Sequence, residues 1–162
     1  MIYDNIRLAI SRCDFIGAFA NIGPLRGGRL VISGACLDPR DPTSLRLVTH
    51  ELFHSLGIFH HHERIDRDLY ISVNWLNIPL PSWLQFIWNP LYLPDGVPYD
   101  CHSLMHYDET AFAINKKIKT LIARNPKTCD LKCPSHKPTQ ADIQLLRIKY
   151  NCKKDKPKYK SP

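Results

Sequence analysis

Three histidines and a glutamate lie in one short run of the 162-residue chain, which reads HELFHSLGIFH from His50 to His60. Residues four apart share one face of a helix, so His50 and His54 can bind one metal ion together. Glu51 lies beside them, where its carboxylate can accept a proton from a metal-bound water rather than bind the metal. Gly57 lets the chain leave the helix sharply, through positive φ if required, and brings His60 back as a third ligand.

Three imidazole ligands leave a coordination position open for water, which is typical of catalytic rather than structural zinc sites. The short pattern HExxH occurs by chance, whereas HExxHxxGxxH fixes five positions and is far more specific. His61 and His62 follow directly and are alternative third ligands. A histidine-rich helix whose rings only pack is the other interpretation, and it fits a lone histidine better than this set.

A helix must present this run, and the flanking sequence predicts one. Thr43 or Ser44 can cap a helix that continues to about Leu56 and ends at Gly57. At about 100° per residue an apolar stripe falls on nearly the opposite face from the histidines. The stripe consists of Leu45, Val48, Leu52 and Leu56. The helix is therefore expected to have one side for packing and one for the metal.

The other expected elements are few and short. Strands are predicted at Ile6–Ile10 and Arg29–Ser33, with Phe15–Ala20 as a weaker candidate. Five prolines make residues 79–98 irregular. A second helix is expected over Thr139–Tyr150, with Thr139 as its cap.

Composition excludes several classes of protein. Tyr70–Leu93 is the most apolar stretch, but prolines and polar residues interrupt it, so it predicts no membrane span. The formal net charge is +7, and 14 of the 22 Lys and Arg residues lie after residue 115. Residues 153–162 are predicted to be a basic, disordered tail. Such a tail is most often only solvated, with weak polyanion binding as the alternative. Aromatic residues do not interleave with the charges, so no specific nucleic-acid binding is expected.

Six cysteines favour disulfides and an oxidising compartment. The first residues, MIYDN, have neither the positive nor the apolar region of a signal peptide. The chain is thus expected to be a fragment or processed form, or else intracellular with free thiols.

Beyond the metal-binding run, the sequence is recognisable. His50–Asp68 resembles the zinc motif of the astacin family, which are secreted metzincin endopeptidases. Tyr70–Ile78 continues the likeness, and Ser103–Tyr107 is similar to the family's Met-turn. Lys119–Lys127 and Asp142–Cys152 resemble its closing segments, so the resemblance extends over about residues 6–152.

The resemblance implies a role for each matching residue. The ligands of a single Zn²⁺ ion would be His50, His54 and His60. Glu51 would be the general base, and Met105 would form an apolar floor beneath the metal. Tyr107 would be an additional ligand that leaves the zinc to donate a hydrogen bond to the developing oxyanion, which lowers the barrier.

The resemblance also implies an α+β fold of the astacin-like metzincin (zincin) type. A twisted sheet and the active-site helix would lie above a cleft, and an irregular lower part with a C-terminal helix would lie below it. Residues 1–152 would form this peptidase domain, without the family's N-terminal portion. Arg29–Ser33 is the candidate edge strand for an extended substrate.

The activity implied is that of a secreted zinc endopeptidase, which hydrolyses peptide bonds in proteins through a zinc-activated water. The alternative is an inactive astacin-like pseudoenzyme or truncated fragment that retains zinc binding.

Departures from the family pattern concern His61 and the cysteines. His61 stands where the family has a glutamate that pairs with the buried amino terminus, and Glu63 is expected to point elsewhere.

Cys13 and Cys36 look like the family's short-range disulfide, and the partner of Cys152 would lie in the missing portion. The remaining cysteines are additional to the family pattern, and they are Cys101, Cys129 and Cys133. A local or rescuing disulfide is expected for these cysteines, whose pairing the sequence leaves open, with a second metal site at Cys129, Cys133 and His136 as the alternative.

One further segment, from Trp83 to Leu93, is unusually apolar. Core packing is the favoured interpretation, and a docking patch for substrate or a partner is the alternative.

Overall fold

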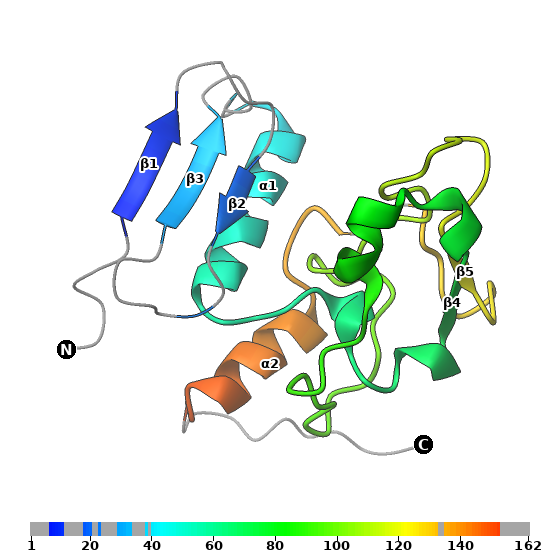
Figure 1. Cartoon of the computed structure of the whole chain (residues 1–162). Helices are drawn as coiled ribbons and strands as arrows, with labels where there is room; N and C mark the ends of the chain where they lie inside the picture. The colour runs from blue at the N-terminus through cyan, green and yellow to red at the C-terminus, as the bar shows by residue number, and fades with distance from the viewer. Residues whose placement is uncertain are drawn as a thin grey trace.

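A three-stranded sheet forms the first part of the molecule. The computed structural model describes residues 7–11, 18–20, 23, 29–33, 38, 40–132 and 135–152, and only the backbone of the three strands. The strands are β1 (Arg7–Ser11), β2 (Ala18–Ala20) and β3 (Arg29–Ser33), in the spatial order β1-β3-β2. β3 pairs parallel with β1 and antiparallel with β2. Helix α1 (Pro42–Ser55) lies against the sheet and contacts β2 and β3 (Figure 1).

The strand predictions hold in part. Arg29–Ser33 is a strand as expected, and the first strand begins and ends one residue later than predicted. The prediction that Arg29–Ser33 is an edge strand is wrong, because this strand is hydrogen-bonded on both sides. Of the weaker candidate Phe15–Ala20, only Ala18–Ala20 lies within the described residues, and it is a strand.

Helix α1 begins slightly earlier than expected. Its N-cap is Asp41, whose carboxylate accepts a hydrogen bond from the Thr43 N–H at 2.9 Å. Pro42 at the first helical position fixes this start, because proline needs no intrahelical partner for its nitrogen there. Ser44 instead accepts the Asp38 N–H at 3.0 Å. At the other end Gly57 has a φ of +82°, so the predicted sharp exit through positive φ is confirmed.

The predicted packing stripe of α1 is wrong. Leu45 is 59% exposed and Leu52 is 45% exposed. The helix instead buries Phe53 together with a polar set that consists of Ser44, Glu51, His54 and Ser55. The helix therefore turns its polar face, rather than its leucines, toward the rest of the described molecule.

Short turns of 3₁₀ helix dominate the second part, formed by residues 61–132 and 135–152. They are η2 (His61–Glu63), η3 (Arg67–Leu69), η4 (Trp75–Asn77) and η5 (Leu80–Phe86). A two-stranded antiparallel sheet joins β4 (Ile71–Val73) to β5 (Leu121–Ala123). The irregular chain predicted for residues 79–98 is thus interrupted by η5. The mixture of short sheets and helices matches the predicted α+β fold.

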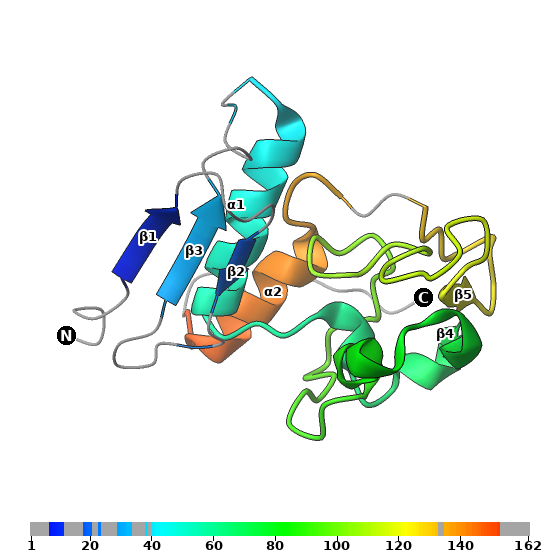
Figure 2. The ribbon, with the colours of Figure 1, turned by 45° about the horizontal axis from the view of Figure 1, so that its top comes forward.

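Helix α2 (Gln140–Lys149) lies beside α1 in both ribbon views (Figures 1 and 2). Thr139 caps it as predicted, and Tyr150 follows its last turn. The Tyr150 hydroxyl donates to the Leu56 carbonyl at 2.9 Å, which ties the end of α2 to the end of α1.

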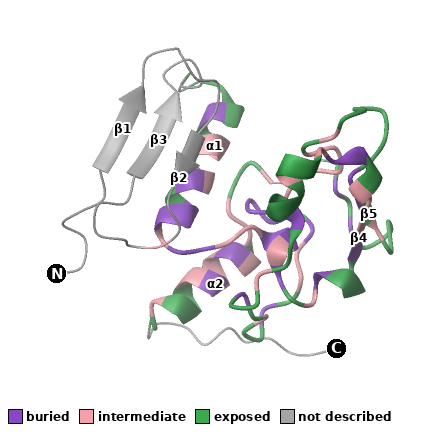
Figure 3. Cartoon of the chain, viewed as in Figure 1, coloured by how far each residue is buried: buried purple, intermediate pink, exposed green. Residues whose placement is uncertain are grey.

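The interior holds two apolar clusters, and buried residues run through both parts (Figure 3). The first joins the end of α1 to the second part and consists of Phe53, Ile58, Tyr92, Val97, Leu104, Met105 and Leu145. The second lies within the second part and includes Ile71, Ile78, Phe86, Leu121 and Leu131.

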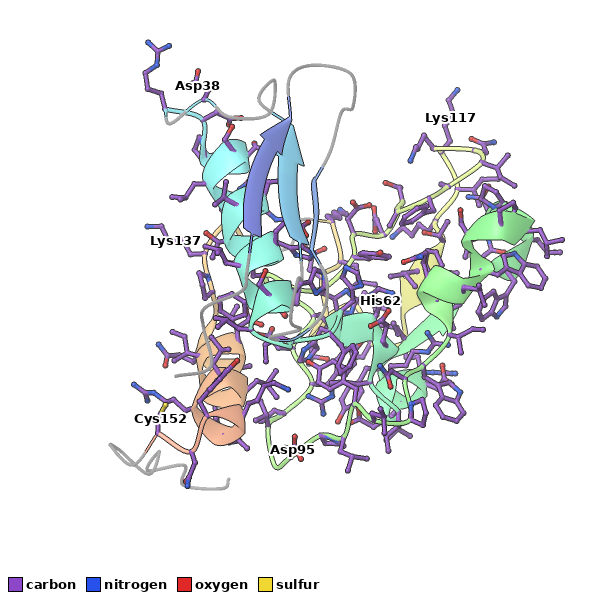
Figure 4. All side chains as sticks on the ribbon, turned by 60° about the vertical axis from the view of Figure 1, so that its left-hand side comes forward. Asp38, His62, Asp95, Lys117, Lys137 and Cys152 are labelled. Carbon is purple, nitrogen blue, oxygen red and sulfur yellow. A yellow bond between two sulfur atoms is a disulfide. The ribbon has the colours of Figure 1, made fainter. Side chains whose placement is uncertain are left out.

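A disulfide joins Cys101 to Cys129, which are 28 residues apart, so it pairs two of the cysteines whose partners the sequence left open. It removes Cys129 from the alternative metal site. Cys152 is exposed and has a free thiol (Figure 4). Cys13, Cys36, Cys133 and the predicted tail, residues 153–162, lie outside the described residues. Among the described residues no helix is both long and apolar enough to span a bilayer.

The buried carboxylate of Asp142 holds the turn that contains Met105. It accepts hydrogen bonds from the Ser103 hydroxyl at 2.5 Å and from the Leu104 N–H at 2.9 Å. The Thr139 N–H, at the start of α2, donates to the same carboxylate at 2.9 Å. One side chain therefore fixes the Met-turn to α2.

We predict that Asp142→Asn lowers the free energy of unfolding by about 1–3 kcal/mol, because an amide group cannot accept all three hydrogen bonds. Asp95→Asn is the matched control, since Asp95 is exposed in a surface turn with a φ of +49° that asparagine tolerates (Figure 4). Urea denaturation measures the free energy of unfolding of both variants. An equal effect of the two substitutions would contradict the role given to Asp142.

Candidate metal centre

Three imidazoles converge at the end of α1. One ring nitrogen from each of His50, His54 and His60 lies within 4.8 Å of the others. The Nε2 atoms of His54 and His60 are 3.0 Å apart. Helix α1 supplies the first two rings, and the turn at Gly57 returns the chain so that His60 faces them. The predicted convergence of these three side chains is therefore present.

Backbone carbonyls fix the orientation of two of the rings. The Nδ1 of His50 lies 3.0 Å from the Leu104 carbonyl oxygen, and the Nδ1 of His54 lies 2.8 Å from that of Ile58. Because a carbonyl only accepts hydrogen bonds, each Nδ1 must carry the proton. Each Nε2 then has a free lone pair, which is the tautomer that a metal ligand requires.

Glu63 orients the third ring. Its carboxylate accepts the His60 N–H at 3.1 Å, and its other oxygen lies 3.5 Å from the His60 Nδ1. The expectation that Glu63 does not take the place of the glutamate that pairs with the amino terminus stays a prediction, because residues 1–6 lie outside the described residues. A carboxylate at Nδ1 favours protonation there and leaves Nε2 as the acceptor.

This arrangement fits a divalent cation. With both Nδ1 atoms protonated, the Nε2 lone pairs of His54 and His60 face each other across 3.0 Å without a proton between them. Two such lone pairs repel unless a cation accepts both. Burial also lowers the pKa of His54 to about 4 and that of His60 to about 3, and it lowers the pKa of His50 well below its usual value. The imidazoles are thus neutral, as metal ligands must be.

Glu51 contributes a buried carboxylate that is not fully hydrogen-bonded. One of its oxygens, Oε2, has no hydrogen-bond partner within the described part of the chain. Burial raises the pKa of Glu51 to about 7. A carboxylate with this pKa can accept and release a proton near neutral pH.

All of these groups line one open cleft of about 640 Å³. Tyr107 lines it as well, with its ring centroid 4.5 Å from that of His60. The other walls are formed by Arg46, Leu47, Pro81, Ser82, Gln85, His106, Asp108 and Phe112. Met105 is fully buried in the first apolar cluster, and its backbone N–H donates to the Ser103 hydroxyl oxygen at 3.0 Å. Its expected role as a floor beneath the metal stays a prediction.

The family model named Astacin, which describes the astacin peptidases, matches residues 4–151. The chain belongs to the astacin family. A zinc metalloproteinase nas-8 of Steinernema carpocapsae is 33% identical over 156 residues, which cover 93% of this chain and 34% of that protein. The low choriolytic enzyme of Oryzias latipes is 36% identical over 108 residues, covering 65% of this chain and 38% of that enzyme. The chain thus spans about a third of the length of the curated relatives it matches.

Solved structures agree with this membership. The high choriolytic enzyme 1 of Oryzias latipes, a hatching enzyme zinc-protease, superposes with a TM-score of 0.73 at 28% identity. The match covers 93% of this chain and 70% of that one. Myroilysin has a TM-score of 0.58 at 16% identity, which shows a shared fold alone.

In this astacin-family chain the two histidines after His60 do not join the cluster. The fully buried His61 accepts the Asp100 N–H at its Nε2, at 3.0 Å. His62 places its Nε2 2.8 Å from the Gln85 carbonyl oxygen, and its ring stacks on that of Tyr107 with centroids 4.0 Å apart. Both rings are used for internal contacts, so neither alternative third ligand is supported.

Sequence reasoning missed Glu63 and the two orienting carbonyls. Glu63 has a detectable signal, because it follows His60 by three residues, the spacing at which a side chain returns to an N-cap backbone. The carbonyls of Leu104 and Ile58 have no side-chain signal at all. Only the folded backbone brings Leu104 to His50, which is 54 residues away.

We predict that Gly57→Ala weakens zinc binding by about tenfold, because an alanine strained by about 1–2 kcal/mol at positive φ would displace His60. A Cβ at Gly57 would also lie 2.5 Å from the Lys149 Cε, which is a flexible contact. Chelator competition measures the affinity.

Gly96→Ala is the matched control, because Gly96 has a φ of +72° and open space around its Cβ. It should lose comparable stability and keep the zinc affinity of the parent chain. Equal zinc affinities for the two variants would contradict the role of Gly57.

Proposed function

We propose that this chain is a zinc-dependent endopeptidase domain that hydrolyses peptide bonds in protein substrates. The observation that carries the proposal is the cluster of three neutral imidazoles beside the Glu51 carboxylate in one open cleft, where Glu51 Oε2 has no hydrogen-bond partner among the described residues. The relatives named as zinc metalloproteinases, and the hatching enzyme zinc-protease among the solved structures, support the same activity.

Each residue has a distinct task in the proposed reaction. His50, His54 and His60 would hold the zinc through their Nε2 atoms. The ion, when bound, would polarise the scissile carbonyl and lower the pKa of water toward 7. Glu51 accepts a proton from the attacking water at Oε2 and then delivers it to the leaving amine. Its raised pKa suits both transfers at neutral pH.

Tyr107 serves as a hydrogen-bond donor in this proposal. Burial raises the pKa of its phenol above the usual value, so the hydroxyl keeps its proton at neutral pH. A neutral phenol in the cleft can donate to the oxyanion that develops as the carbonyl is attacked. The interaction forms with charge that is present only in the transition state, so it lowers the barrier.

The remaining proposals concern organisation and compartment. Residues 1–152 would form one peptidase domain, and residues 153–162 a basic tail. The disulfide between Cys101 and Cys129 supports an extracellular or otherwise oxidising location. Weak polyanion binding by the lysine-rich end stays a prediction, because residues 153–162 lie outside the described residues.

We predict that Glu51→Gln lowers the rate of peptide cleavage by about 10²–10⁴-fold and leaves one zinc per chain, because the amide cannot accept a proton and the ligands are untouched. Casein or a quenched peptide reports cleavage, and metal analysis reports zinc.

Glu109→Gln is the control, since Glu109 pairs with Lys119 at 2.7 Å and does not line the cleft. It should retain full activity. Zinc binding without any Glu51-dependent cleavage would overturn the proposal and favour the non-catalytic zinc-binding alternative.

A further inference from the structure

The second part of the molecule has an exposed apolar surface in a stretch of sequence without charged residues. No Asp, Glu, Lys, Arg or His occurs between Asp68 and Asp95. Ten large hydrophobic side chains of this stretch are exposed, and six of them lie between residues 80 and 91: Leu80, Trp83, Leu84, Ile87, Trp88 and Leu91. We call these six residues the apolar face. They lie on and just after η5, which is drawn mostly as exposed and lies on the opposite side of the molecule from β1 (Figures 1 and 3). Core packing, the interpretation favoured from sequence for the segment from Trp83 to Leu93, holds for Phe86 and Tyr92, which are buried. It is wrong for the exposed large apolar residues of that segment, which are Trp83, Leu84, Ile87, Trp88, Leu91 and Leu93.

The backbone beneath the apolar face is firmly held. Phe86 is fully buried, and its carbonyl accepts a hydrogen bond from the guanidinium of Arg67. The preceding carbonyl, of Gln85, lies 2.8 Å from the His62 Nε2, and the Trp83 indole donates to the Ile78 carbonyl at 3.1 Å. These contacts keep the exposed side chains from folding into the core. The apolar face is thus a fixed feature of the surface.

A cleft with two arginines adjoins the apolar face. It measures about 490 Å³, and its lining includes Ile87 and Trp88 of the apolar face together with Arg67 and Arg124. Asp68 supplies the one carboxylate of the lining and accepts from the Arg67 Nε at 3.0 Å. The Arg124 Nε donates to the Asp68 carbonyl at 2.6 Å, which fixes this exposed guanidinium beside the cleft. Arg67 is buried and also donates to the carbonyls of His62 and Phe86, so Arg124 is the exposed cation of this cleft.

We propose that the apolar face and the arginine cleft together dock on an anionic phospholipid surface. Tryptophan and leucine side chains are suited to the boundary between headgroups and acyl chains, and a charge-free stretch enters it at little desolvation cost. One guanidinium can bind two phosphate oxygens, so the exposed Arg124 suits a lipid phosphate in the adjoining cleft. The apolar face and the arginine cleft adjoin at Ile87 and Trp88. A lipid needs such an arrangement, because its apolar tail and its charged headgroup are joined.

Charge favours a lipid surface over a second copy of the chain. A two-fold interface across the apolar face would be self-complementary and would bring the two exposed Arg124 guanidiniums toward each other. Like charges facing one another oppose such pairing. An anionic membrane instead supplies both the apolar layer and the negative charge that the cleft lacks.

The test is sedimentation of the whole chain with vesicles of phosphatidylcholine, with and without phosphatidylglycerol. We expect binding to the vesicles that contain phosphatidylglycerol. Trp88→Ala should weaken it about tenfold through lost apolar insertion, and Arg124→Gln about fivefold through the loss of one charge. Circular dichroism and zinc content confirm that each variant is folded.

Two variants serve as matched controls. Ile148→Ala removes an exposed apolar side chain from α2, and Lys117→Gln removes a cation that projects from the surface (Figure 4). Both should bind vesicles like the parent chain, apart from the small effect of one distant charge.

Three results would overturn the proposal. One is the absence of vesicle binding by the parent chain, and another is equal binding by the parent chain and Trp88→Ala. The third is a dimer without vesicles that Leu84→Asp dissociates, because the apolar face would then be a contact between copies of the chain.

Discussion

The structure depends on holding three neutral imidazoles with their lone pairs pointed at a common centre. His54 and His60 bring two unprotonated nitrogens to 3.0 Å, an arrangement that is unfavourable until a cation occupies it. Polar partners behind the rings maintain this geometry: a carbonyl for His54 and the carboxylate of Glu63 for His60. The folded chain therefore holds two lone pairs that repel each other, and a bound cation would relieve this repulsion. Metal binding is thus expected to stabilise the folded chain.

The parts of the chain that create this geometry lie far apart in sequence. Asp142 fixes the Met-turn to α2, and the Leu104 carbonyl of that turn fixes His50 on α1. The Tyr150 hydroxyl, just after α2, donates a hydrogen bond to the Leu56 carbonyl at the end of α1. A perturbation of α2 is thus expected to reach His50, a proposed metal ligand, through two hydrogen-bonded steps. This coupling explains why an irregular second part, with little regular secondary structure, can position a site with the precision that a metal requires.

Sequence reasoning succeeded where a local pattern determines the structure. The spacing of the histidines and the turn at Gly57 predicted the convergence, and Thr139 predicted the start of α2. It failed where tertiary contacts decide. Leu45 and Leu52 of α1 are exposed because the helix buries Phe53 and a polar set instead, and β3 is central because β1 and β2 both pair with it. Likewise, only the folded chain brings Cys101 beside Cys129 and Glu63 beside His60.

X-ray absorption at the zinc edge tests the central claim most directly, because it identifies the atoms around the ion in the intact chain. The account predicts one zinc per chain with three imidazole nitrogens at about 2.0–2.1 Å and oxygen completing the shell. The variant His60→Ala should lose one of the three nitrogens. A shell that contains sulfur, or one that keeps three imidazoles in that variant, would contradict the claim that His50, His54 and His60 bind the metal.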